Sequence, residues 1–223
     1  MNLAFIPMYI RYLGMEAYGL IGIYAILQAS LALVDAGMSA TLGREMSRFL
    51  GGKHTKESIR DLLRSIETTG FVIAVLYGLT IMVSSDWLAT KWVLVEQIPA
   101  QSVSQAFTIM GFITAMRLME GLYRGAINGL QKLVLFNISN AFLATLRSVG
   151  AVVILAFYSP TIIAYFLWQA VVSILTLIIF ARIVYKILPA GTRPGRFSRF
   201  ELIQAWPFAA GMLATTSLAL LLT

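Results

Sequence analysis

The chain of 223 residues carries 17 Lys and Arg against 10 Asp and Glu, yet 59% of its residues are hydrophobic and only 12% are charged. With a mean hydropathy of +0.81, this composition lies outside the range of soluble globular domains and predicts an all-α, polytopic membrane protein. The absence of cysteine excludes disulfides, thiolate metal sites and thiol nucleophiles.

The apolar residues lie in separated blocks, most of them about 16 to 25 residues long, which is close to the length that crosses a bilayer as a helix. In chain order the blocks cover residues 1–10, 17–42, 68–84, 103–123, 133–157, 161–180 and 203–223. The five interior blocks are long enough to span. The first block is short and the last ends without a polar tail, so we expect a fragment cut at both ends.

Positive charge alternates between the connections of these blocks. The stretches 43–67, 124–132 and 182–202 hold six, two and five Lys or Arg, whereas the alternate connections hold only Arg11 and Lys91. Because short cytoplasmic loops retain positive charge, this alternation predicts that the three basic loops face the cytoplasm. The predicted location is the inner, or plasma, membrane.

A linker is expected after the sixth block. The sequence "PAGTRPG" at residues 189–195 is typical of a flexible cytoplasmic connection, and Ser198 with Glu201 has the spacing of a capping box that opens a helix. The predicted division is a transmembrane lobe at 1–188 with a truncated first helix, a linker and amphipathic entry at 189–202, and the truncated start of a second lobe at 203–223.

Several functional classes find no support in the residues. The single histidine, His54, lies in "GGKHTKES" and is expected to be solvated, without partners for a metal ion. The net charge of +7 is confined to particular connections, which favours membrane topology over nucleic-acid binding. No phosphate-binding glycine loop and no nucleophile and base pair is present, so we expect no enzyme, no cofactor and no bound metal.

Ionisable residues inside the apolar blocks are the strongest functional signal, because each is costly in a bilayer unless paired or hydrated. Arg117, Glu120 and Arg124 are three and four residues apart and therefore share one stripe of a helix. They make one side of that helix polar.

A second polar stripe lies on the fifth block, where Asn137, Asn140 and Arg147 are separated by three and seven residues. We predict Arg147, Arg117, Asn140 and Asn137 as substrate-binding candidates that line a cavity, because guanidinium binds phosphate oxygens in bidentate fashion.

Four further charges are predicted to have structural or coupling roles: Asp35, Glu120, Arg124 and Arg44. One interpretation pairs Asp35 with Arg117, and Glu120 with Arg124 or Arg117, as internal links of a bundle. The alternative is that the excess of buried guanidinium lines a cavity for an anionic cargo. Gly121, Gly125 and Gly129, four residues apart, favour close helix packing.

Three segments carry a resemblance to a known family. They are "PMYIRYLGMEAYGLIGIYAILQ", "LVDAGMSATLGREMSR" and "LMEGLYRGAINGLQKLVLFNISNAFLATLRSVGAVVIL". In order and placement they resemble the polysaccharide-export and O-antigen flippases, within the superfamily that includes the multidrug and toxin extruders. The likeness covers nearly the whole chain.

The resemblance implies two six-helix lobes around a central cavity, which passes an undecaprenyl-pyrophosphate-linked oligosaccharide outward. This chain would be the N-terminal lobe, the linker and the first helix of the second lobe. Its implied partners are the lipid-linked substrate, membrane lipids and polysaccharide assembly proteins. Members use cationic cavity residues for the pyrophosphate, and Arg147 and Arg117 occupy suitable positions.

Two alternatives remain open at this point. A multidrug extruder of the same fold would prefer acidic and aromatic cavity residues for cationic drugs. A non-transporting membrane protein or an integral-membrane glycosyltransferase is the other, and the transferase would need carboxylates or a metal site at a membrane face.

Overall fold

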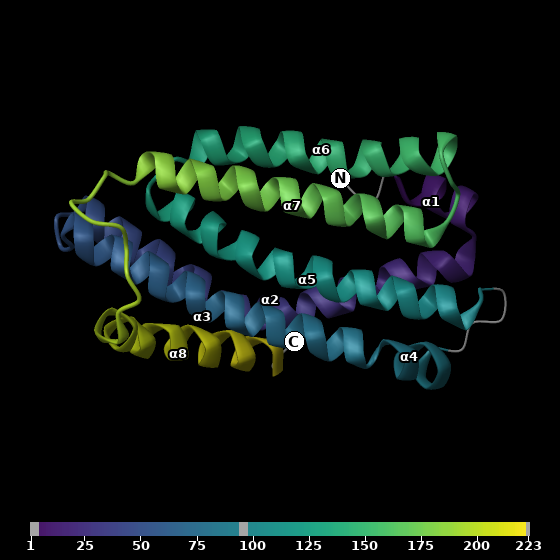
Figure 1. Ribbon diagram of the computed structural model, residues 1–223, viewed down its shortest axis with the longest axis horizontal. Helices are drawn as coiled ribbons and strands as arrows, with labels where there is room; N and C mark the ends of the chain where they lie inside the picture. Colours follow the sequence, from purple (N-terminus) through teal and green to yellow (C-terminus); the bar gives the residue numbers. More distant parts are fainter. Residues whose placement is uncertain (1–4, 94–97, 222–223) are drawn as a thin grey trace.

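The computed structural model describes residues 5–93 and 98–221, and within these ranges the chain is helical and contains no strand (Figure 1). The all-α prediction is therefore confirmed. The elements are α1 (Ile6–Leu13), α2 (Met15–Leu50), α3 (Lys56–Val83), α4 (Ser85–Trp87), the π-helical turn η2 (Leu88–Trp92), α5 (Ala100–Gly129), α6 (Leu133–Phe157), α7 (Ile162–Ile187) and α8 (Arg199–Leu221).

Among the described residues, three helices are long and apolar enough to cross a membrane: α3, α6 and α7. The outer face of α6 carries exposed apolar side chains such as Val134, Ile138 and Phe142, each more than 60% exposed. A soluble protein rarely exposes so continuous an apolar surface. The structure thus supports a membrane protein, while spanning by α2 and α5, of 36 and 30 residues, stays a prediction.

Helix α5 is the centre of the bundle. It contacts α2 and α3 on one side and α7 on the other, and α6 packs on α7 (Figure 1). Its own side chains are largely buried, with Phe107, Met110, Ile113 and Leu118 at 1% exposure or less. Polar residues of α5 are therefore placed between neighbouring helices rather than in lipid.

The three basic connections lie together at one end of the bundle, on the left of Figure 1, and the alternate connections lie at the other end. This arrangement is the one that the alternation of positive charge predicts. Parts of the terminal blocks, residues 1–4 and 222–223, lie outside the described residues.

The basic stretches are not loops over their full predicted length. Helix α2 continues to Leu50 and α3 begins at Lys56, so only residues 51–55 connect them. Thr55 caps α3 by accepting a hydrogen bond from the Ser58 amide (3.1 Å). Likewise α5 extends to Gly129, α7 to Ile187, and α8 begins at Arg199. The prediction of long loops was wrong because the helices continue beyond their apolar blocks.

The glycine ridge packs α5 against α2, as predicted. A methyl group at Gly125 would overlap the Ser39 carbonyl, and one at Gly129 would overlap the Gly43 carbonyl. Both neighbouring atoms belong to the backbone, which cannot rotate away. The absence of side chains on this ridge therefore sets the distance between the two helices.

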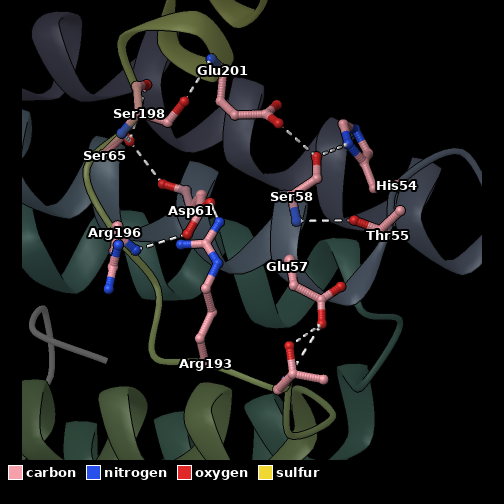
Figure 2. A network of polar contacts seen from close by, with 11 residues as sticks. His54, Thr55, Glu57, Ser58, Asp61, Ser65, Arg193, Arg196, Ser198 and Glu201 are labelled. Carbon is pink, nitrogen blue, oxygen red and sulfur yellow. Dashed lines mark hydrogen bonds and ion pairs between the residues drawn. The ribbon is translucent and has the colours of Figure 1, made fainter.

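The linker after α7 is fastened to α3, which corrects the prediction of a flexible connection (Figure 2). Asp61, only 8% exposed, accepts hydrogen bonds from Arg193 Nη2 (2.6 Å) and from the Arg196 amide (2.7 Å). Ser65 Oγ accepts from the Ser198 amide (2.8 Å). Glycine and proline make an isolated segment flexible, but hydrogen bonds to buried acceptors on α3 fix the conformation of this linker.

The capping box forms in part. Ser198 Oγ accepts a hydrogen bond from the Glu201 amide (3.4 Å), as the spacing predicts. The Glu201 carboxylate, however, accepts from Ser58 Oγ on α3 (2.8 Å) instead of reaching back to Ser198. Helix α8 packs along α2 and α3. A methyl group at Gly37 of α2 would lie 2.8 Å from the Ala209 carbonyl of α8, so the contact is close.

His54 is not solvated, contrary to expectation. Its side chain is only 13% exposed; Nε2 lies 2.7 Å from Glu45 Oε2 and Nδ1 lies 3.0 Å from Ser58 Oγ. Helix α2 continues past its apolar block and brings Glu45 to this ring. The charged composition of residues 51–58 hides that contact, since the partners come from outside the segment.

Candidate functional site

A cluster of two arginines and one glutamate lies in the middle of the bundle. Glu120 of α5 is fully buried, and its two carboxylate oxygens face different arginines. Oε2 lies 3.2 Å from Arg117 Nη1, one turn earlier on the same helix, and Oε1 lies 3.4 Å from Arg147 Nη2 on α6. A single carboxylate is thus shared between two guanidinium groups, which leaves the cluster with a surplus of positive charge.

The remaining bonding capacity of the arginines is only partly used. Arg147 Nη2 also lies 3.4 Å from Thr176 Oγ1 of α7. The Nε atoms of Arg117 and Arg147 are buried, and neither has a hydrogen-bond partner among the described residues. Because a buried donor without a partner is costly, these two N–H groups are hydrogen-bonding capacity that the described protein groups do not use.

A cavity of about 180 Å³ adjoins this cluster. The two arginines, Glu120, Asn140, Ser148 and Thr176 provide its polar lining, together with Leu143 and Ala144. Arg147 lies 14 residues from the start of α6 at the basic end, a depth of about 21 Å, and 10 residues from the other end of the helix. The cavity therefore lies near the middle of the bundle.

The other predicted cavity residue on α6 lies elsewhere. Asn137 is exposed and does not line this cavity, whereas Asn140 does. Both share a stripe with Arg147, but they lie at different depths. Asn137 as a substrate-binding residue stays a prediction, because helical spacing decides the face of a residue and not its depth.

Asp35 does not pair with Arg117. Among the described residues its carboxylate accepts a hydrogen bond from Ser39 of the same helix, and Arg117 is paired with Glu120. Asp35 instead lines a second, open cavity of about 400 Å³ along the glycine ridge, together with Arg44 and Arg124. Three of the four charges predicted as structural thus lie together, and Glu120 belongs to the arginine cluster.

A second carboxylate cluster was not predicted. Glu67 of α3 is 5% exposed; it accepts hydrogen bonds from Tyr123 of α5 (2.8 Å) and Tyr185 of α7 (2.7 Å), and it pairs with Arg64 (3.3 Å). The spacing of Arg64 and Glu67 was the only signal in the sequence. Glu67 joins three helices, but its oxygens are fully engaged by protein donors, so it acts as a structural link.

The groups that line the mid-bundle cavity suit the binding of an anion. Its donors are guanidinium, amide and hydroxyl groups, and its one carboxylate is held by two arginines. Within residues 5–93 and 98–221, no group of three His, Asp or Glu side chains is placed to hold a metal ion. The arrangement suits a ligand with oxygen atoms that carry negative charge.

Comparisons with known proteins give no match. No family model matches the chain, and neither the curated proteins nor the solved structures provide a significant match.

Proposed function

We propose that this chain forms the N-terminal six-helix lobe, and the first helix of the second lobe, of a flippase that moves a lipid-linked oligosaccharide across the inner membrane. The cargo is an undecaprenyl-pyrophosphate-linked oligosaccharide used for polysaccharide or O-antigen export. The proposal draws on the family resemblance of three sequence segments and on one structural observation: two arginines share a single carboxylate beside a polar cavity at mid-bundle depth.

The charge of the cluster supports an anionic cargo. A neutral or cationic cargo gains nothing from two guanidinium groups with only one carboxylate between them. A pyrophosphate offers several oxygens and would satisfy the Nε donors of Arg117 and Arg147 that lack partners. The multidrug extruder is less well supported for the same reason, because it requires a surplus of negative charge for cationic drugs.

The orientation proposed for the lobe places the three basic connections in the cytoplasm. In this orientation the cargo reaches the arginine cluster about 21 Å from the cytoplasmic end of α6. Polysaccharide assembly proteins and membrane lipids are the remaining proposed partners.

The test replaces Arg147 in cells whose own copy of the gene is deleted. Arg147→Ala removes a charge-assisted contact of about 1.5–3 kcal/mol, so we expect export to fall about tenfold or more, with lipid-linked sugar retained on the cytoplasmic leaflet. Arg147→Lys keeps the charge and should retain part of the activity. The matched control is Asn137→Ala, on the same helix face but outside the cavity.

Membrane levels of each variant are measured alongside export. Normal export by Arg147→Ala at normal membrane level would contradict the proposed role of the cluster. Equal loss in Asn137→Ala would also contradict it, because the effect would then not follow the cavity.

A further inference from the structure

A trough runs between α8 and the pair formed by α2 and α3, and its lining changes from polar to apolar along its length. At the basic end it opens as a polar chamber of about 430 Å³. The next chamber, of about 210 Å³, is apolar and lies further along α8 toward the middle of the bundle. Ala205 of α8 lines both chambers, so the two are neighbours.

The surface of the apolar chamber is almost entirely hydrocarbon. Its lining includes Met38, Ile66, Ile73, Trp206, Ala209 and Leu213. The two threonines that also line it have their hydroxyls engaged: Thr41 Oγ1 donates to the Gly37 carbonyl (2.6 Å) and Thr69 Oγ1 to the Ser65 carbonyl (2.9 Å). Water finds no partners in such a space, whereas a hydrocarbon chain fills it favourably.

The polar chamber holds a connected set of charges. Arg48 and His54 both bind the Glu45 carboxylate, at 2.8 Å and 2.7 Å. Ser58 Oγ donates to Glu201 of α8 (2.8 Å) and lies 3.0 Å from His54 Nδ1 (Figure 2). His54 thus joins Glu45 of α2 to Ser58 of α3, and Ser58 in turn joins α3 to Glu201 of α8.

The chamber also holds a cation without a carboxylate partner. Arg48 and His54 contact Glu45, and Glu201 accepts a hydrogen bond from Ser58, so both carboxylates of the lining are engaged by other side chains. Within the described part of the chain, Lys53 is exposed and makes no ion pair. An anionic ligand would give Lys53 a partner.

We propose that this trough binds one anionic glycerophospholipid, with its phosphodiester beside Lys53 and Arg48 and one acyl chain in the apolar chamber. The order of the chambers matches the order of headgroup and chain in such a lipid. The source is the leaflet at the basic end, where anionic headgroups gather around positive residues. From Gln204 to Leu213 the trough follows α8 for about 13 Å, enough for the upper part of an acyl chain.

The test uses the fluorescence of Trp206, which lines the apolar chamber. The purified full chain in detergent is titrated with phosphatidylglycerol whose acyl chains carry bromine, a quencher that acts at contact. Subtracting the signal of Trp206→Phe isolates the Trp206 part from Trp87, Trp92 and Trp168. We expect saturable quenching at one lipid per chain. Brominated phosphatidylcholine should bind at least fivefold more weakly, because its headgroup carries no net charge.

Two pairs of variants locate the lipid. Lys53→Gln should weaken binding about fivefold, whereas Lys91→Gln, a lysine at the opposite end, should not. Ala209→Phe fills the apolar chamber and should remove the quenching, whereas Ala141→Phe, on the exposed face of α6, should not. Circular dichroism checks the helicity of the phenylalanine variants. If Ala209→Phe fails to fold, the lysine pair decides, since Lys53 is exposed.

Four outcomes would overturn the proposal. Equal quenching by brominated phosphatidylcholine would mean ordinary lipid contact without a site. Unchanged binding of brominated phosphatidylglycerol to Lys53→Gln would mean the same. Displacement by soluble glycerophosphoglycerol at equal concentration would mean an anion site without a chain. Displacement by undecaprenyl phosphate, but not by unbrominated phosphatidylglycerol, would assign the trough to the polyprenyl lipid.

Discussion

Arg147 of α6 and Arg117 of α5 bind opposite oxygens of the same carboxylate, that of Glu120 (3.4 and 3.2 Å). Glu120 thus contacts two guanidinium groups in the cavity lining, and it joins α6 to the central helix. The pairing makes Arg147 compatible with an apolar helix, and the surplus charge makes the same place suitable for an anion.

Replacing Glu120 tests the link between the two helices. Glu120→Gln leaves two partly buried arginines without a carboxylate, so we expect the free energy of unfolding to fall by about 3 kcal/mol or more. Denaturant unfolding of the chain in detergent measures the loss. The double variant Glu120→Gln with Arg147→Met also removes one of the two arginine charges. Its loss of unfolding free energy should be smaller than the sum of the losses in the two single variants. Additive losses would mean that the two side chains do not depend on each other.

The glycine ridge gives a second prediction with an internal control. Gly129→Ala places a methyl group against the Gly43 carbonyl, and we expect a loss of about 1–3 kcal/mol as α2 and α5 separate. The control is Gly22→Ala on α2, because a methyl group at Gly22 has no neighbouring atom within 4 Å. It should stabilise the helix by up to about 1 kcal/mol. Thermal unfolding compares the two, and a similar loss in both would contradict the packing role.

Asp61 fastens the linker to α3, and replacing Asp61 should free the linker from α3. Because Asp61 binds both Arg193 and the Arg196 amide, Asp61→Ala removes charge-assisted hydrogen bonds of about 1.5–3 kcal/mol. We expect trypsin to cleave after Arg196 about tenfold faster or more. Asp86→Asn is the control, because the Asp86 carboxylate accepts a hydrogen bond from Ser104 and lies away from the linker. An unchanged cleavage rate in Asp61→Ala would mean that the linker is held by other contacts.

Glu45 makes the polar chamber sensitive to acid. Burial opposes its ionisation, but hydrogen bonds from His54 and Arg48 outweigh this effect and hold the pKa of Glu45 below its ordinary value of 4.5. A lowered pKa in the folded state contributes stability that is present above the ordinary pKa. That contribution is lost as the pH falls through the lowered value.

The corresponding measurement is the melting temperature of the wild type and of Glu45→Gln between pH 7 and pH 3. The wild type should be the more stable at pH 6, and the difference should shrink below about pH 4.5. A difference that stays constant down to pH 3 would show that the Glu45 carboxylate does not carry the effect.

Local pattern was sufficient for the predictions that depend on one helix at a time. The helical period places Arg117 and Glu120 on one stripe, and the structure pairs them. The glycine spacing predicts a close helix contact, which α2 and α5 make. The alternation of basic connections predicts two ends of opposite character, and Figure 1 shows that arrangement.

Predictions that needed a partner from a distant segment were less successful. The sequence interpretations paired no carboxylate with Arg147, yet Glu120 of α5, 27 residues earlier in the chain, contacts it. The period of one helix does not show which residue of a neighbouring helix it faces. His54 and residues 189–195 failed for a related reason, since their contacts come from neighbouring helices. Asp35 accepts a hydrogen bond from Ser39 of its own helix instead of pairing with Arg117.

By itself the sequence determined that this protein is all-helical, apolar enough for a membrane and basic at one end, because these properties follow from composition and from periods of a few residues. Only the tertiary structure decided that Glu120 serves two arginines, that the linker lies on α3, and that a polar and an apolar chamber adjoin beneath α8. Those relationships depend on how helices rotate and slide against one another, and side chains far apart in the sequence set that packing together.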